Sequence, residues 1–123
     1  MRRYRALLPH PLESRLLVMQ REGDWGLPEW EEAADHAWWR TDHVNRAVAV
    51  RFGVESTVLR CLRDDEARSE RVYEFDNHSA AHDVAPACTW IGRAELDLLD
   101  IPDADARVLI DDWFRRDAGE EAL

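Results

Sequence analysis

Acidic side chains gather in one stretch of the sequence and could bind a divalent metal. Glu29, Glu31 and Glu32 lie close together, and Asp35 follows shortly after them. Carboxylate oxygens are the ligands that hard cations such as Mg²⁺ take in proteins. Glu74, in a later segment, is a further candidate for such a site. In a chain this acidic, the same carboxylates are also expected on any solvated surface, so a metal site here is the lesser alternative.

Aromatic side chains flank the same stretch and could bind a flat or phosphorylated ligand. Trp25 precedes it, Trp38 and Trp39 end it, and Arg46 follows. An indole ring can stack on a base or on another apolar group, and a guanidinium can pair with phosphate. We therefore take these four residues as the candidate ligand site. The alternative is that the tryptophans pack a loop onto the core and Arg46 forms an internal ion pair.

The segment Arg46–Val54 has the spacing of a metal-binding helix without the side chains of one. Positions 47, 50 and 51 lie at i, i+3 and i+4, so on a helix they share one face. Three carboxylates there would suit Mg²⁺, which reaches proteins through carboxylates and substrate phosphates. The sequence has Ala47, Val50 and Arg51 instead. None of these is a ligand for a hard metal, and the arginine would repel one.

This segment resembles the end of a Nudix box, G-x5-E-x7-R-E-U-x-E-E-x-G-U, in which U is a bulky aliphatic residue. The arginine, the aliphatic residue after it and the final pair of the pattern are present, as Arg46, Val48, Gly53 and Val54. The last three glutamates of the pattern are absent, because their positions hold Ala47, Val50 and Arg51. The upstream Gly and Glu positions hold Glu32 and Trp38.

Two further motifs extend the resemblance over most of the chain. Trp25–Pro28 is similar to the W-x-L-P that precedes many Nudix boxes, although Glu29 and Trp30 replace the two glycines that normally follow. Thr89–Leu96 is similar to the late strand and turn of the family. The resemblance implies a Nudix-like α/β/α sandwich with a mixed, curved sheet, formed by residues 1–123 as a single domain.

Three functions are compatible with a Nudix-like domain that lacks the box glutamates. The first is a module that has lost magnesium-dependent pyrophosphohydrolase activity, needs no cofactor, and binds a partner or a ligand such as a nucleotide or other phosphate-containing small molecule. The second is a diverged hydrolase of nucleoside diphosphate derivatives, with Mg²⁺ held by Glu29, Glu31, Glu32 or Glu74. The third is an N-terminal accessory domain, fused to or associated with a kinase-like phosphotransferase. A homodimer is a further expectation.

Composition excludes some classes of partner. The net charge is -10, and the 16 basic residues are all arginine. Sequence-independent binding to nucleic acid depends on basic side chains that neutralise phosphates, so we expect no nucleic-acid partner. No apolar run approaches the roughly 18 residues of a membrane span, and the start of the chain lacks the apolar region of a signal peptide. These features predict a cytoplasmic protein without a membrane partner.

Other potential sites are better explained by structural roles. His78, His82 and Cys88 could hold a soft metal, but their spacing is irregular and a fourth ligand is missing. Cys88 and the only other cysteine, Cys61, lie in strand-like segments and are expected to be buried free thiols. Two acidic residues near a predicted helix start, Glu95 and Asp97, are expected to be caps or surface charges.

Hydrophobic periodicity and turn residues predict the elements that must position these side chains. Strands are expected over residues 3–8, 15–21, 54–62, 70–77 and 87–91, with a charged turn at 64–68. Helices are expected over residues 41–52, 94–99 and 103–116. The apolar residues of the first helix also alternate as in a strand, but Thr41 as its N-cap, Gly53 as its stop and the register of the Nudix resemblance favour a helix. Residues 29–40 are expected to form a short helix or an ordered loop.

Overall fold

The computed structural model describes residues 1–33, 40–79 and 83–119. Predictions that concern Asp35, Trp38, Trp39 and His82 fall outside these residues. Seven strands and three helices follow one another in the described chain: β1 (Arg2–Leu7), β2 (Leu16–Arg21), β3 (Asp24–Gly26), β4 (Glu29–Glu32), α1 (Asp42–Phe52), β5 (Ser56–Asp65), β6 (Glu70–Asn77), β7 (Cys88–Ile91), α2 (Arg93–Leu96) and α3 (Ala104–Asp117).

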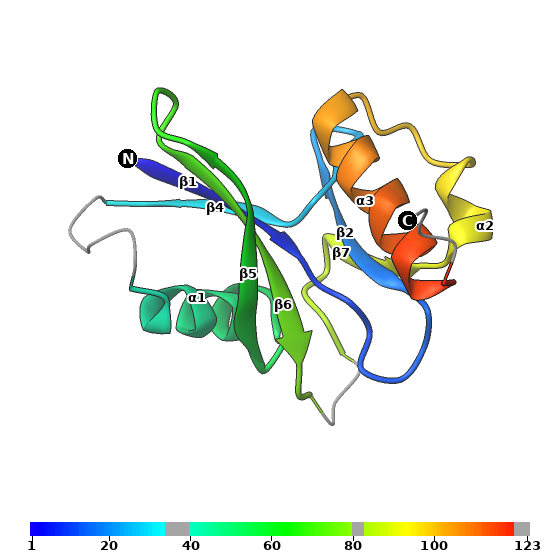
Figure 1. Cartoon of the computed structure of the whole chain (residues 1–123), viewed down its shortest axis with the longest axis horizontal. Coiled ribbons are helices and arrows are strands. Elements are labelled where there is room, and N and C mark those ends of the chain that lie inside the picture. The colour runs from blue at the N-terminus through cyan, green and yellow to red at the C-terminus, as the bar shows by residue number, and fades with distance from the viewer. Residues whose placement is uncertain (34–39, 80–82, 120–123) are drawn as a thin grey trace.

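The strands form two sheets. The larger has the order β4-β1-β6-β5, and it is mixed because β1 runs parallel to β6 while the other neighbours are antiparallel. The smaller has the order β3-β2-β7 and is antiparallel. The predicted mixed sheet is confirmed, and it is accompanied by a second sheet that lies beside it (Figure 1).

One core lies between the larger sheet and α1. Alternate residues of β1, Tyr4 and Ala6, are buried there with Phe75 of β6. The helix contributes Val44 and Val48 to the same core. This alternation places one face of each strand against the helix, as the two-residue period of a strand requires.

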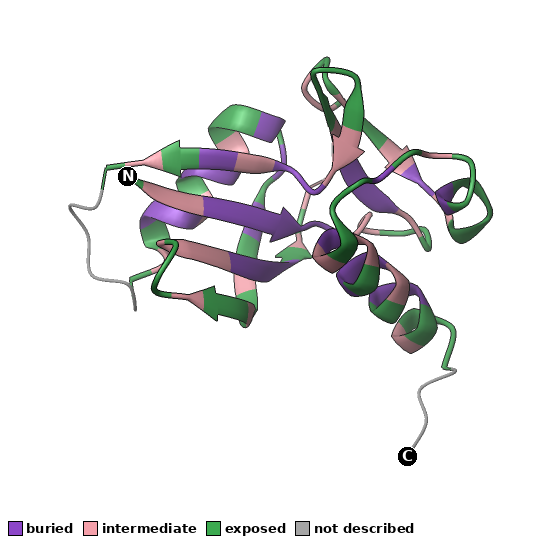
Figure 2. Cartoon of the chain, turned by 90° about the horizontal axis from the view of Figure 1, so that it is seen from above, coloured by how far each residue is buried: buried purple, intermediate pink, exposed green. Residues whose placement is uncertain are grey.

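A second core lies on the side of α3. Leu7 of β1 and Val72 of β6 are buried there together with Leu109 and Ile110 of α3. Residues of the smaller sheet and of α2 complete this core. Figure 2 shows the corresponding buried stripe along α3. The larger sheet therefore lies between α1 and α3, and the predicted α/β/α architecture is confirmed.

The helix predicted at the box segment is present as α1. Gly53 ends it in the left-handed conformation with φ of 77°, and its N–H donates to the carbonyl of Ala49 at 3.1 Å. Thr41 occupies the N-cap position, but its side chain makes no capping hydrogen bond. The β-branched residues of this segment also alternate as in a strand. The helical period prevails because it buries one continuous apolar face against the sheet.

Three local predictions were wrong. Residues 29–32 form β4 rather than a helix or loop, because Trp30 is buried in the α1 core and the segment pairs with β1. Strand β5 continues to Asp65, so the turn begins later than expected. Cys61 is exposed, whereas Cys88 is partly buried. In the part of the chain that the structure describes, no helix is long and apolar enough to cross a bilayer.

Candidate functional site

The face of α1 that would carry metal ligands is instead apolar and cationic. Ala47 is nearly buried, whereas Val50 is 85% exposed and Arg51 is exposed. A recess at this face is formed by α1 together with the end of β4. It has a volume of about 630 Å³ and is lined by Glu32, His43, Arg46, Ala47, Val50 and Arg51. This recess can offer two guanidinium groups and an apolar patch to a ligand.

The one carboxylate in this recess is already paired. Glu32 Oε2 lies 3.0 Å from His43 Nδ1, so the side chain at the end of β4 is tied to the first turn of α1. His43 is 7% exposed, and its ring also contacts Tyr4 edge-on. The pair fixes the entry of the chain into α1 and occupies an oxygen that a metal would need.

The other candidate metal ligands do not converge on this face. Glu29 accepts from Arg3 Nε at 2.8 Å and also pairs with Arg21. Because side chains alternate along a strand, Glu29 and Glu31 point to the opposite face of β4 from Glu32. Glu31 is exposed and has no ion-pair partner within the described chain.

Glu74 is also occupied elsewhere. Its carboxylate is 5% exposed in the middle of β6 and lies 3.2 Å from Arg116 of α3 and 3.5 Å from Arg60 of β5. Burial of a carboxylate requires such compensation, because the charge is otherwise poorly solvated. Glu74 therefore anchors the C-terminal half of α3 to the larger sheet.

Trp25 and Arg46, two members of the predicted ligand site, border different cavities. Trp25 lies on β3, packs against the α3 core and lines a cavity of about 250 Å³. Arg46 is exposed on α1 and pairs with Asp42 at 3.6 Å, one turn earlier. Arg46 therefore forms an ion pair, but the pair is solvent-exposed rather than internal and is of the kind that contributes little stability.

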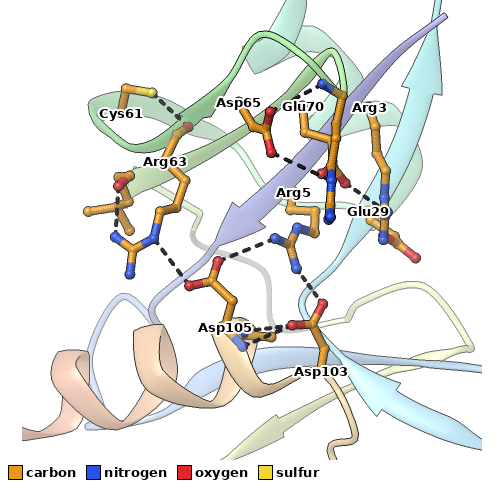
Figure 3. Close-up of polar contacts among 12 residues, drawn as sticks. Arg3, Arg5, Glu29, Cys61, Arg63, Asp65, Glu70, Asp103 and Asp105 are labelled. Atoms are coloured by element: carbon orange, nitrogen blue, oxygen red, sulfur yellow. Dashed lines mark hydrogen bonds and ion pairs between the residues drawn. The ribbon is translucent and has the colours of Figure 1, made fainter.

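An ionic network covers the face of the larger sheet that is turned toward α3. Figure 3 shows Arg5 between Asp103 and Asp105, with Arg5 Nη1 2.8 Å from Asp103 Oδ2. Arg63 of β5 lies 3.2 Å from Asp105. On the same face Arg3 lies 2.7 Å from Glu70. The sequence reasoning missed this network, although the alternation of Arg3 and Arg5 along β1 already places both on one face.

The remaining candidate residues have structural roles. Glu95 Oε1 accepts from the N–H of Gly92 at 3.3 Å, which makes it a cap of α2, and Asp97 pairs with Arg107 at 2.7 Å. His78 contacts the Thr57 hydroxyl at 2.9 Å rather than Cys88. Burial raises the pKa of the Cys88 thiol to about 11, so this thiol is protonated at neutral pH.

Several solved structures with the same arrangement of sheets and helices are Nudix proteins. A Nudix hydrolase from Nitrosomonas europaea matches with a TM-score of 0.67 and 12% identity, over 99% of this chain and 76% of that one. The Nudix domain of Shewanella oneidensis NrtR, in complex with ADP ribose, matches with a TM-score of 0.59 and 17% identity, over 96% of this chain and 87% of that one. The chain has the Nudix fold.

A longer protein also contains this fold. A candidate oxidoreductase from Sinorhizobium meliloti matches with a TM-score of 0.69 and 14% identity, over 94% of this chain. This chain spans 39% of the length of that protein. The sequence itself matches no model of a protein family and no curated protein.

The residues present do not fit the magnesium ion that a Nudix box implies. In residues 1–33, 40–79 and 83–119, no three His, Cys, Asp or Glu side chains are grouped so that they could hold a metal. At the three positions of α1 that the resemblance assigns to glutamates, Ala47, Val50 and Arg51 offer a methyl group, an isopropyl group and a guanidinium. Mg²⁺ requires oxygen ligands, and a nearby guanidinium opposes its charge.

Proposed function

We propose that this Nudix-fold domain binds a nucleotide or another phosphate-containing small molecule and does not hydrolyse it with magnesium. The observation that carries the proposal is the face of α1 at Ala47, Val50 and Arg51, where the box glutamates are missing from a helix that is otherwise preserved. The fold supports a ligand site, and the chemistry of this face argues against a metal-dependent reaction there.

The state of the other acidic residues supports the same proposal. Glu29 is held by two arginines, Glu32 by His43, and Glu74 by two further arginines. A metal site rebuilt from them would have to break these pairs and bring together side chains from both faces of β4. Metal binding depends on convergent, deprotonated ligands, so the energetic cost of that rearrangement opposes it.

Ligand binding is the activity that the geometry of the recess still permits. Its guanidinium groups can pair with phosphate oxygens, and its apolar patch can cover an uncharged part of the ligand. Among proteins with the same fold, the Nudix domain of NrtR binds ADP ribose. ADP ribose is therefore a suitable first probe for this chain.

A turnover assay tests the loss of hydrolysis. The protein is incubated with a panel of nucleoside triphosphates and nucleoside diphosphate derivatives in Mg²⁺ or Mn²⁺, and released phosphate, pyrophosphate and nucleoside monophosphate are quantified. We expect no release above the protein-free blank, while an active Nudix hydrolase run in parallel turns the panel over.

Metal-dependent turnover that persists through purification would contradict the proposal and favour a diverged hydrolase. In that case Glu31→Gln and Glu32→Gln, on opposite faces of β4, would show from which face the metal is held.

A further inference from the structure

We propose that Arg51 takes the place of the metal, so that the phosphate group of the ligand is bound by a guanidinium and binding needs no divalent cation. This inference rests on the proposed function, because it specifies how that ligand is held. Arg51 occupies the position of a box glutamate, and the replacement of a carboxylate by a guanidinium reverses the charge at that point of the helix.

The position of Arg51 gives it access to both recesses around α1. It lines the recess of about 630 Å³ with Arg46 and Val50. It also lines a neighbouring recess of about 430 Å³ that is bordered by β2 and β4. An anion beside Arg51 is favoured in the larger recess, where the one carboxylate is paired with His43, and the Arg51 side chain is exposed enough to meet it. The smaller recess is also lined by Glu31, which has no ion-pair partner in the described chain and opposes an anion there.

Arg51 is also a cation that no carboxylate neutralises within the described residues. Its neighbours differ in this respect, because Arg46 pairs with Asp42 and Arg21 pairs with Glu29. A guanidinium already held by a carboxylate must lose that partner before it binds phosphate, whereas Arg51 loses only water. Of these three arginines, Arg51 is therefore the one best able to bind an anion.

The helix itself opposes an anion at this end, but the opposition is smaller. Arg51 lies in the last turn of α1, where the macrodipole amounts to roughly half a negative charge. The guanidinium carries a full positive charge at the tip of a long side chain, farther from the helix axis. Gly53 also satisfies a carbonyl of the last turn through its N–H. The net effect near Arg51 is attraction of an anion.

The apolar neighbours define the rest of the ligand. Val50 is 85% exposed beside Arg51, and Ala47 lines the same recess. An inorganic anion would leave this patch uncovered. The site thus fits a small molecule that carries a phosphate or diphosphate group joined to an uncharged, partly apolar group.

Isothermal titration calorimetry tests this assignment with inorganic pyrophosphate and ADP ribose as probes, each in Mg²⁺ and in EDTA. We expect both probes to bind with the same Kd in the two buffers, and ADP ribose to bind more tightly because it also covers the apolar patch. Arg51→Ala should weaken binding by about tenfold or more, as expected for the loss of a hydrogen bond to a charged group.

Arg115→Ala is the matched control. Arg115 is an exposed arginine in the last turn of α3, and its loss changes the net charge by the same amount. The Arg115→Ala variant should bind both probes with the Kd of the wild type. Thermal melts should show that all variants are folded.

Three results would overturn the inference: binding that EDTA abolishes, an Arg51→Ala variant that binds like the wild type, or no binding of either probe at millimolar concentration. The first two results would leave the proposed function intact, because a ligand still binds and is not hydrolysed. The third would contradict the binding part of the proposed function as well.

Discussion

Asp103 joins the first turn of α3 to the larger sheet. Its carboxylate accepts from the N–H groups of Asp105 and Ala106 at 3.0 and 3.1 Å, and it pairs with the buried Arg5. Burial by itself would raise the pKa of this carboxyl group. The backbone donors and Arg5 outweigh that effect, so the pKa of Asp103 in the folded protein is lower than usual.

The lowered pKa of Asp103 predicts that this residue makes the stability of the folded protein sensitive to acid. Because the folded-state pKa lies below the unfolded value of about 3.9, the stabilisation by Asp103 is fully present above that value and is lost as pH falls through the folded pKa. Asp103→Asn keeps a capping side chain but removes the charge. We expect the variant to be less stable than the wild type at pH 6, and the difference to shrink toward pH 3.

Urea denaturation across this pH range measures the effect. Asp112→Asn, at an exposed position of the same helix, serves as the control and should follow the wild-type curve. A constant difference between Asp103→Asn and the wild type at every pH would contradict the prediction.

Among the elements, α1 has its C-terminal end determined by the residue that follows it, Gly53. Gly53 adopts φ of 77°, a conformation that other L-residues rarely adopt. A Cβ atom at this position would also lie 3.2 Å from the carbonyl oxygen of Asp83. The end of the Nudix helix is thus fixed by local backbone geometry and by the approach of a distant loop.

Gly53→Ala should therefore destabilise the fold by about 1–2 kcal/mol, the cost of a left-handed conformation with a Cβ. The free energy of unfolding from urea titration provides the measurement. Gly26→Ala is a suitable comparison, because a Cβ there meets no atom within 4 Å and its φ is not positive. Equal losses in the two variants would show that the conformation of Gly53 does not determine the stability of this end of α1.

At the scale of the whole molecule, the larger sheet supports two cores. Leu17 lies in the core beneath α1 and Ile110 in the core beneath α3, and both are fully buried. Strands β1 and β6 contribute residues to both cores. Loss of packing on one side of the sheet should therefore destabilise the other side as well.

Leu17→Ala and Ile110→Ala should each reduce the free energy of unfolding by about 2–5 kcal/mol, since each leaves a cavity in a packed core. Tryptophan fluorescence and far-UV circular dichroism should report one coincident transition for both variants. Leu98→Ala, at a side chain that is 82% exposed, should change little. Two separated transitions in either core variant would show that the cores unfold independently.

Much of the framework could be read from the sequence. Strand β6 and the long last helix follow from apolar spacing and terminal residues. The apolar spacing of residues 42–52 also fits a strand, and there the cap position, the Gly53 stop and the resemblance to the Nudix box favoured the helix. The absence of carboxylates at positions 47, 50 and 51 was likewise a property of residue type and helical period alone. These features are local, and neighbouring residues along the chain suffice to specify them.

Only the tertiary structure decided the partners of the charged residues. Residues 29–32 form a strand because their backbone groups pair with those of β1 and because Trp30 is buried in the core beneath α1. That strand then placed Glu29 beside Arg3 and Glu32 beside His43, on opposite faces. Arg51 was left without a carboxylate among the described residues. Ion pairs form between side chains far apart in sequence, and they depend on strand register and helix rotation, which local periodicity does not determine.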